Sequence, residues 1–186
     1  MVETPSKMVP LGTKAPDFTL PDTISGKRMS LEELKSEQAT VVMFICNHCP
    51  YVKHLQGQLV ELANDYIPQG VAFIAISSND ADGYPEDRPE RMQEVAQRLG
   101  YPFPYLYDEP QEVAKAYKAA CTPDFYIFDQ DMKLVYRGQL DSSRPNSGVP
   151  VTGQDVRSAL DNLLAGKPVD PHQVPSLGCN IKWKEL

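Results

Sequence analysis

A run of apolar residues leads directly into a pair of cysteines, and this junction constrains the fold more than any other stretch of the chain. Residues 41–45 (Val-Val-Met-Phe-Ile) are all β-branched or large and apolar, a pattern typical of a strand buried on both faces. Residues 46–49 read Cys-Asn-His-Cys. Apolar side chains then recur every three or four residues from Val52 to Tyr66, the period of an amphipathic helix. The sequence therefore predicts a strand, a Cys-x-x-Cys motif and a helix in direct succession.

Two cysteines at the start of a helix predict redox chemistry. Cys46 stands where the strand ends, so its sulfur can face the unpaired N–H groups and the positive end of the helix dipole. Both favour the thiolate, which is the nucleophilic form, and a protonated His48 would lower the pKa of Cys46 further. Cys49, placed one turn inside the helix, is expected to resolve the mixed disulfide that Cys46 forms. Cys46, His48 and Cys49 are therefore the predicted catalytic residues.

Other uses of such a motif have less support in the sequence. A structural zinc site needs a second pair of ligands, and the remaining cysteines, Cys121 and Cys179, each stand alone. Thiolate and imidazole could also bind copper, with His172 as the one remote histidine. We predict no metal ligand set and no cofactor. A metal-binding or redox-sensing module without turnover stays an alternative from a different functional class.

The rest of the chain alternates between strand and helix patterns, which predicts a mixed α/β layer architecture. The tail that follows residue 166 has three prolines and no periodicity, but its Ile181 and Trp183 indicate that it docks on the rest of the protein. We therefore expect one domain over residues 1–166, with residues 167–186 packed on it. Further strands are expected near 71–77, 105–107, 124–128 and 133–137, and further helices near 90–99, 111–120 and 154–165.

Composition excludes some partners. The net charge of −7 argues against nucleic acid, because neutralising phosphates requires clustered lysine and arginine. No apolar run approaches the roughly 18 residues of a membrane-spanning helix, and residues 1–11 lack the apolar core of a secretory signal. We therefore expect a cytoplasmic protein without membrane partners. In that reducing compartment four cysteines are more often catalytic, metal-binding or idle than structural.

Four short blocks of the chain resemble redoxins of the alkyl hydroperoxide reductase/thiol-specific antioxidant (AhpC/TSA) family. The resemblance implies a thioredoxin fold, a central mixed sheet flanked by helices, here with an N-terminal extension and a C-terminal tail. The order and spacing of the blocks make it specific. They are Gly12–Leu20 (GTKAPDFTL), Val41–Pro50, Thr122–Asp129 (TPDFYIFD) and Leu134–Gly138.

The resemblance also implies a substrate-binding loop. In the thioredoxin fold a cis-proline faces the two cysteines, and Pro123 matches it. Thr122 before it would offer backbone groups to a bound thiol or peptide. The implied activity is thiol–disulfide exchange with protein or small-molecule disulfides and thiols, using an unidentified reductant. Thioredoxins also carry a buried aspartate on the strand before the motif, and residues 41–45 contain none.

A peroxiredoxin-like antioxidant peroxidase is the alternative reaction within the same family. Peroxiredoxins carry Pro-x-x-x-Thr-x-x-Cys, whose threonine contacts the peroxide. Aligning Cys49 with the last residue puts Cys46 in the threonine position, and aligning Cys46 puts Met43 there. Neither register supplies the peroxide pocket, so we rank peroxidase activity below disulfide exchange.

The two remaining cysteines are accessory candidates. Cys121 stands two residues before Pro123, so it would lie near the motif if the proline loop faces it. It could be a third redox thiol or a partner for Cys179, or simply a small apolar residue at a helix end. Cys179 would be a resolving thiol if the tail docks near the motif, and Gly178 would let the chain turn before it.

Overall fold

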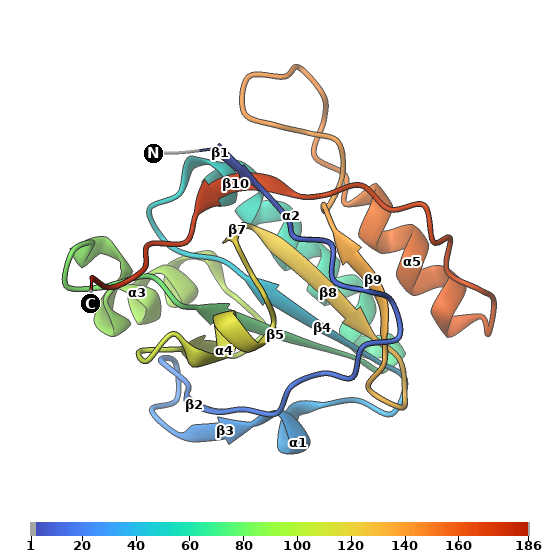
Figure 1. The fold of residues 1–186 in the computed structure, drawn as a ribbon, viewed down its shortest axis with the longest axis horizontal. Coiled ribbons are helices and arrows are strands. Elements are labelled where there is room, and N and C mark those ends of the chain that lie inside the picture. The colour runs from blue at the N-terminus through green and yellow to red at the C-terminus, as the bar shows by residue number, and fades with distance from the viewer. Residues whose placement is uncertain (1–2, 186) are drawn as a thin grey trace.

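The structure, a computed structural model, describes residues 3–185. A five-stranded mixed sheet forms its centre, with helices on both faces (Figure 1). The sheet contains three parallel strands, β6, β5 and β4, and two antiparallel strands, β8 and β9. In spatial order they are β6 (Tyr105–Tyr107), β5 (Val71–Ser77), β4 (Ala39–Phe44), β8 (Asp124–Phe128) and β9 (Leu134–Gly138).

Strand β4 lies in the middle of the sheet and contributes to both cores. Its side chains alternate, so Val41 and Met43 pack in one hydrophobic cluster while Val42 and Phe44 pack in the other. All four are at most 1% exposed, and each such burial stabilises the fold by about 1.5–3 kcal/mol. The first cluster is covered by α2 (Pro50–Tyr66), α3 (Pro89–Leu99) and α5 (Gln154–Leu164), and the second by α1 (Leu31–Leu34) and α4 (Glu112–Ala116). The predicted strand buried on both faces is confirmed.

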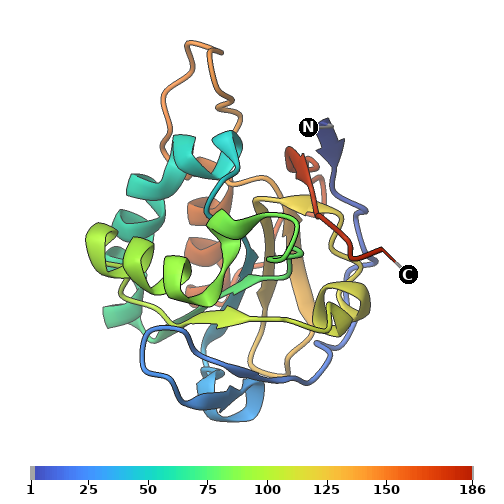
Figure 2. The same cartoon turned by 90° about the vertical axis from the view of Figure 1, so that its left-hand side faces the viewer.

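The two ends of the described chain meet in a second small sheet. Strand β10 (Leu177–Asn180) lies between β1 (Glu3–Pro5) and β7 (Cys121–Thr122), antiparallel to both. Figures 1 and 2 show β1 and β10 side by side at the end of the sheet where the motif lies. The remaining elements are a strand pair, β2 (Thr19–Pro21) and β3 (Arg28–Ser30), and the short helices η1 (Ile67–Gln69) and η2 (Pro85–Asp87).

Several boundaries differ from the sequence expectations. Part of the tail forms the strand β10. The sequence did not predict this strand, because its four residues are too few to show a periodic pattern. The predicted helix over 111–120 is only the short α4, because Lys118 adopts a positive φ of 55° and ends the turn. The loop over 141–153 projects from the rest of the molecule in both views. No helix within residues 3–185 is long and apolar enough to span a membrane.

Candidate functional site

The Cys-Asn-His-Cys motif joins the end of β4 to the start of α2. Cys49 is the N-cap of α2, and its carbonyl oxygen accepts hydrogen bonds from the N–H groups of Val52 and Lys53. Pro50 occupies the first helical position, where its missing N–H costs nothing. Cys49 therefore lies at the helix boundary, not one turn inside the helix as predicted, because the proline starts the helix immediately after it.

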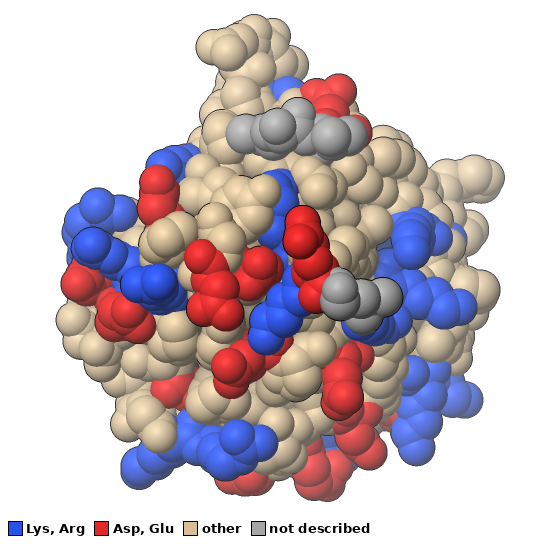
Figure 3. Space-filling view, turned by 60° about the vertical axis from the view of Figure 1, so that its left-hand side comes forward, with Lys and Arg blue, Asp and Glu red and all other residues tan. Residues whose placement is uncertain are grey.

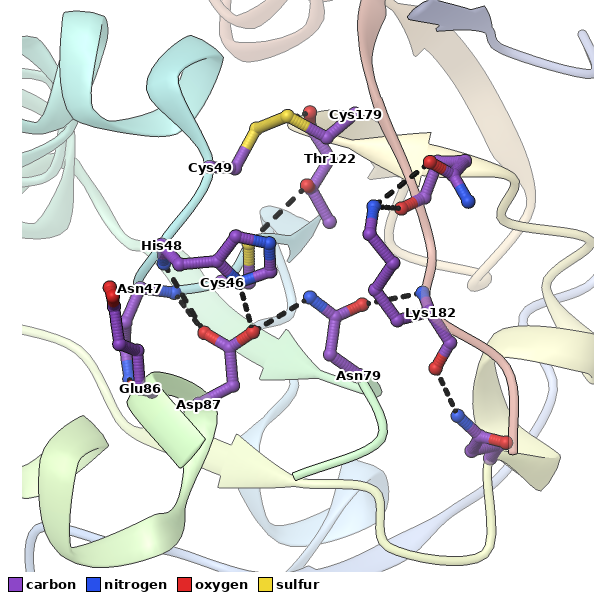
Figure 4. Close-up of polar contacts among 12 residues, drawn as sticks. Cys46, Asn47, His48, Cys49, Asn79, Glu86, Asp87, Thr122, Cys179 and Lys182 are labelled. Carbon is purple, nitrogen blue, oxygen red and sulfur yellow. Dashed lines mark hydrogen bonds and ion pairs between the residues drawn. A yellow bond between two sulfur atoms is a disulfide. The ribbon is translucent and has the colours of Figure 1, made fainter. Parts of the chain in front are cut away.

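Cys49 forms a disulfide with Cys179 of the tail, and Cys46 is a free thiol (Figure 4). The two bonded residues are 130 positions apart, with their Cα atoms 6.2 Å from each other. The pairing of β10 with β7 brings them together, since it places Cys179 opposite Thr122. In this oxidised state Cys46 and Cys49 are therefore not joined to each other, in contrast to the expectation that they form the redox pair. The accessory candidate Cys179 takes the place of Cys46 as the partner of Cys49.

The proline loop lies against both sulfur atoms of the motif. Thr122 and Pro123 are joined by a cis peptide bond, as the resemblance implied. The Cys46 sulfur is 3.6 Å from the hydroxyl oxygen of Thr122, and the Cys49 sulfur is 3.5 Å from its carbonyl oxygen. On its other side the same carbonyl meets Gly178, where a Cβ atom would lie only 1.9 Å from the oxygen. Thr122 is thus enclosed by the motif and by the tail strand.

A buried carboxylate binds the motif from a distant loop. Asp87, at the end of η2, accepts hydrogen bonds from the N–H groups of Asn47 at 2.8 Å and of His48 at 3.3 Å. Its other oxygen accepts one from Asn79 Nδ2 at 2.9 Å and is hydrogen-bonded to Nδ1 of the His48 ring (Figure 4). Burial disfavours the charged form of Asp87, but these hydrogen bonds outweigh burial and hold the pKa of its carboxyl below the usual range.

Asp87 is the functional residue that sequence reasoning missed. The sequence pattern over 79–89 predicts only a polar loop, and nothing in its spacing connects it to the motif. The one available signal was the missing carboxylate on β4, which left the redox site without a buried acid. The fold supplies that acid from the loop between β5 and α3.

The expected low pKa of Cys46 is wrong for this state. Burial, the largest cause, and the negative charge of Asp87 raise the pKa of the Cys46 thiol to about 12. The Thr122 hydroxyl and the main chain at Cys49 and His48 lower it by less. The physical reason is that the sulfur is buried beside the Asp87 carboxylate, and the prediction weighed only the groups that favour a thiolate.

The His48 ring is also held from the solvent side. It stacks on Tyr84, with ring centroids 5.2 Å apart and the planes 11° from parallel. The ammonium of Lys182, from the tail, lies 5.7 Å from the centre of the Tyr84 ring. The main-chain N–H of Lys182 also donates to the side-chain oxygen of Asn79 at 2.9 Å. The tail therefore reaches the site through the disulfide, through Asn79 and through the Tyr84 ring.

Cys121 lies near the same loop but is not bonded to Cys179. Its sulfur is buried and contacts the Pro123 carbonyl oxygen at 3.8 Å. Burial, and after it the negative charge of Asp124, raises the pKa of the Cys121 thiol. Of the three alternatives for Cys121, pairing with Cys179 is wrong, because β10 directs Cys179 toward Cys49.

Within residues 3–185, one group of side chains has the donors for a metal ion. One ligand atom from each of Cys46, His48 and Asp87 lies within 4.8 Å of the others, a sulfur, a nitrogen and an oxygen. In this structure the His48 ring and the Asp87 carboxylate are hydrogen-bonded to each other, so we treat them as a hydrogen-bonded pair. His172, considered as a remote copper ligand, is exposed and bonded to Asp170.

A surface cavity of about 560 Å³ borders the motif at Asn47. Its other walls come from α2, η2 and α3 and include charges of both signs, Lys53, Glu86, Arg91, Glu94 and Arg98. Figure 3 shows acidic and basic side chains interspersed over the face of the molecule on this side. The cavity is an approach to the motif that carries no dominant charge.

Comparison with known proteins points to thiol chemistry. The sequence model of the AhpC/TSA family matches residues 11–137. The thiol-disulfide oxidoreductase ResA of Halalkalibacterium halodurans is 26% identical over 125 residues, which cover 67% of this chain and 65% of that protein. The putative peroxiredoxin Rv2521 of Mycobacterium tuberculosis is 26% identical over 136 residues, covering 67% of this chain and 81% of the relative. The chain thus spans slightly less than two thirds of the length of that ResA.

Solved structures extend the likeness to the whole chain. An uncharacterized conserved protein from Geobacillus kaustophilus is 66% identical with a TM-score of 0.99, covering 100% of this chain and 98% of its own. The hypothetical protein SMc02350 from Sinorhizobium meliloti 1021 is 50% identical with a TM-score of 0.96, covering 98% and 100%. The thioredoxin domain of the thiol-disulfide oxidoreductase BVU-2223 from Bacteroides vulgatus has a TM-score of 0.62 at 18% identity, covering 80% and 96%. The predicted thioredoxin fold is confirmed.

Proposed function

Because the chain belongs to the AhpC/TSA family, we propose that it is a thiol–disulfide oxidoreductase in which Cys46 is the attacking thiol and the Cys49–Cys179 disulfide marks the oxidised form. The relatives named thiol-disulfide oxidoreductase and the family match support the predicted class, an oxidoreductase enzyme of the thiol–disulfide type. The assignment of roles to individual cysteines is the proposal.

One observation carries this assignment. A free thiol and a disulfide lie at the start of the same helix, and the sulfurs of Cys46 and Cys49 both contact Thr122. A thiol beside a disulfide can exchange with it, because a thiolate attacks a disulfide sulfur and displaces the other. The oxidised protein therefore has a free thiol, Cys46, whose sulfur contacts the same residue as the sulfur of Cys49.

A cycle of three exchanges accounts for this arrangement. In the fully reduced protein the Cys46 thiolate attacks a substrate disulfide, forms a mixed disulfide and releases one substrate thiolate. Cys49 then attacks the Cys46 sulfur, which forms the Cys46–Cys49 disulfide and releases the second substrate thiolate. Finally Cys179 attacks Cys49, which returns Cys46 to the thiol and leaves the observed Cys49–Cys179 disulfide. The substrate disulfide gains two electrons, and two protein thiols are oxidised to a disulfide. An external reductant then returns this disulfide to two thiols.

The buried state of Cys46 fits the oxidised end of this cycle. The residue is 1% exposed, and β10 lies against Thr122 beside it. Reducing the Cys49–Cys179 bond removes the covalent link that holds β10, so the reduced protein is the form that opens to a substrate. We propose protein or small-molecule disulfides and thiols as substrates, with an unidentified reductant. A location in the cytoplasm also stays a proposal, which fractionation of cells would test.

Reduction of insulin disulfides tests the proposal. We expect the wild-type protein, supplied with a dithiol reductant, to reduce insulin faster than the reductant alone, and Cys46→Ser to fall to the background rate. Cys121→Ser is the matched control, and it should keep the wild-type rate because Cys121 is a free thiol outside the motif. Hydrogen peroxide consumption by the same proteins tests the peroxidase alternative. Rapid peroxide consumption without insulin reduction would contradict the proposal.

A further inference from the structure

Cys46, His48 and Asp87 form a cluster that could move the proton of the Cys46 thiol. The inference drawn from this cluster rests on the proposed function, in which Cys46 is the attacking thiol. A sulfur, a ring nitrogen and a carboxylate oxygen of Cys46, His48 and Asp87 lie within 4.8 Å of one another. They come from the motif and from η2, 39 positions further along the chain than His48. The cluster is enclosed, since Cys46 and Asp87 are buried and Tyr84 covers the His48 ring.

The hydrogen bond to Asp87 fixes which ring nitrogen of His48 can act as a base. The Asp87 carboxylate can only accept, so Nδ1 is the nitrogen that donates the hydrogen bond. In the neutral imidazole Nε2 is then the atom with a free lone pair. The stacking of the ring on Tyr84 restricts its rotation and keeps this orientation. The geometry thus provides a base whose direction is set by a carboxylate.

Charge balance identifies His48 as the acceptor for the Cys46 proton. If that proton left the cluster, the buried site would hold a thiolate and the Asp87 carboxylate together. Burial first, and the Asp87 charge after it, oppose this and raise the pKa of Cys46 to about 12. The other titratable groups that act on Cys46 cannot take the proton. Lys182 is a cation, although burial lowers its pKa, and Tyr101 and Tyr105 keep their own protons because burial raises their pKa values.

We propose that Cys46, His48 and Asp87 form a nucleophile–base–carboxylate triad in which His48 Nε2 takes the proton of the Cys46 thiol and Asp87 positions and stabilises the resulting imidazolium. The S–H bond breaks, an N–H bond forms at Nε2, and the Nδ1–H···Asp87 hydrogen bond persists. The net charge of the cluster stays at one negative charge and no electrons move. His48 later returns the proton to the thiolate that leaves during exchange. This is the division of roles that activates a nucleophile through an oriented base.

Asn79 supports the triad and links it to the tail. Its amide nitrogen donates to Asp87 and its side-chain oxygen accepts from the main-chain N–H of Lys182. Asp87 acts on Cys46 through His48, so it is a positioning residue. Its direct negative charge works against the thiolate, whereas its hydrogen bond to the imidazolium works for it. The two effects have opposite signs, which makes the proposal testable.

The test uses the oxidised protein in a Cys121→Ser background, where Cys46 is the one free thiol. The rate of its reaction with iodoacetamide and the ultraviolet absorbance of the thiolate are followed against pH. The triad predicts that Asp87→Asn slows the reaction near pH 7 and that His48→Gln slows it as well. Asp108→Asn is the matched control, since Asp108 is also buried and accepts hydrogen bonds from main-chain amides and a hydroxyl. It should leave the profile unchanged. A faster reaction in Asp87→Asn would show that Asp87 only repels the thiolate, and would overturn the triad.

A second measurement does not depend on the fold of the Asp87 variant. Nitrogen NMR of the His48 ring reports the protonation of Nε2 and Nδ1. The triad predicts that the neutral ring carries its proton on Nδ1, because the Asp87 carboxylate accepts from that nitrogen and leaves Nε2 free to act as the base. A neutral ring protonated at Nε2 would overturn the proposal. Both experiments locate a proton and involve no disulfide substrate. Failure of the triad would therefore leave insulin reduction intact, and failure of the exchange activity would leave the ring tautomer intact.

Discussion

The Asp87 carboxylate accepts a hydrogen bond from the main-chain N–H of Asn47 at 2.8 Å, although the two residues are 40 positions apart. This contact closes the loop between β5 and α3 onto the start of α2. Asp87, whose charge adds to burial in raising the pKa of Cys46, is also the residue that orients His48. The site therefore holds an unreactive thiol and the means to activate it.

Loss of Cys179 should destabilise the oxidised protein. The disulfide joins positions 130 residues apart, and removing a link of this kind costs about 2–5 kcal/mol in the free energy of unfolding. Urea denaturation of oxidised wild type and Cys179→Ser measures the difference. Adding a reductant should lower the free energy of unfolding of the wild type to nearly that of the variant, and should leave the value of the variant unchanged. Cys121→Ser provides the comparison for a free cysteine, and an equal loss in that variant would show that the bond is not the cause.

Gly178 should tolerate no side chain. A Cβ atom there would lie 1.9 Å from the Thr122 carbonyl oxygen, so Gly178→Ala must push β10 away from the proline loop. We expect a cost of about 1–3 kcal/mol, typical of overpacking, together with faster reduction of the Cys49–Cys179 bond. Gly57→Ala is the control. Gly57 lies inside α2, and a Cβ atom added there would have no heavy atom within 4 Å, so this variant should gain about 0.5–1 kcal/mol. Unchanged stability in Gly178→Ala would contradict the close packing of β10.

Asp124 should make stability depend on pH. It directly follows the cis-proline, is buried, and accepts hydrogen bonds from the hydroxyls of Ser6 and Tyr126. Burial raises its pKa from 3.8 to about 7, so the folded protein holds this proton more tightly than the unfolded chain does. Stability from this group is therefore full below the unfolded pKa and is lost as the pH rises toward 7.

Removing the carboxyl should remove that slope. We expect the free energy of unfolding of wild type to fall between pH 4 and 7 more steeply than that of Asp124→Asn, measured by urea denaturation at each pH. Asp131→Asn, at an exposed turn, should follow the wild type. Parallel curves for wild type and Asp124→Asn would mean that Asp124 is charged in the folded protein throughout this range.

The fold was predictable to a large extent, because its central signals are local. The apolar run at 41–45, the helical period from Val52 to Tyr66 and the proline at position 50 each act over a few residues. They place β4, the motif and α2 in order, and the resemblance adds the cis bond at Pro123. The four-residue strand β10 was not predicted, because its stability comes from pairing with β1 and β7 and not from its own sequence.

The sequence could not predict which residues contact the site residues. Cys49 and Cys179 are joined by the docking of the tail, and Asp87 reaches His48 through the packing of a polar loop. Neither relationship leaves a spacing pattern in the chain. As a consequence, the direction predicted for the pKa shift of Cys46 was wrong. A helix N-terminus alone favours a thiolate, whereas burial and a neighbouring carboxylate oppose it.

Trapping the first mixed disulfide tests the central claim most directly. Reduced Cys49→Ser, which keeps Cys46 and Cys179 but cannot resolve, is mixed with an excess of a small-molecule disulfide and mapped by mass spectrometry without reduction. The same variant carrying Cys46→Ser is the control. If exchange begins at Cys46, the mixed disulfide with the small molecule forms on Cys46 and is absent from the control. An adduct that forms at Cys179 alone, with Cys46 unmodified, would contradict it.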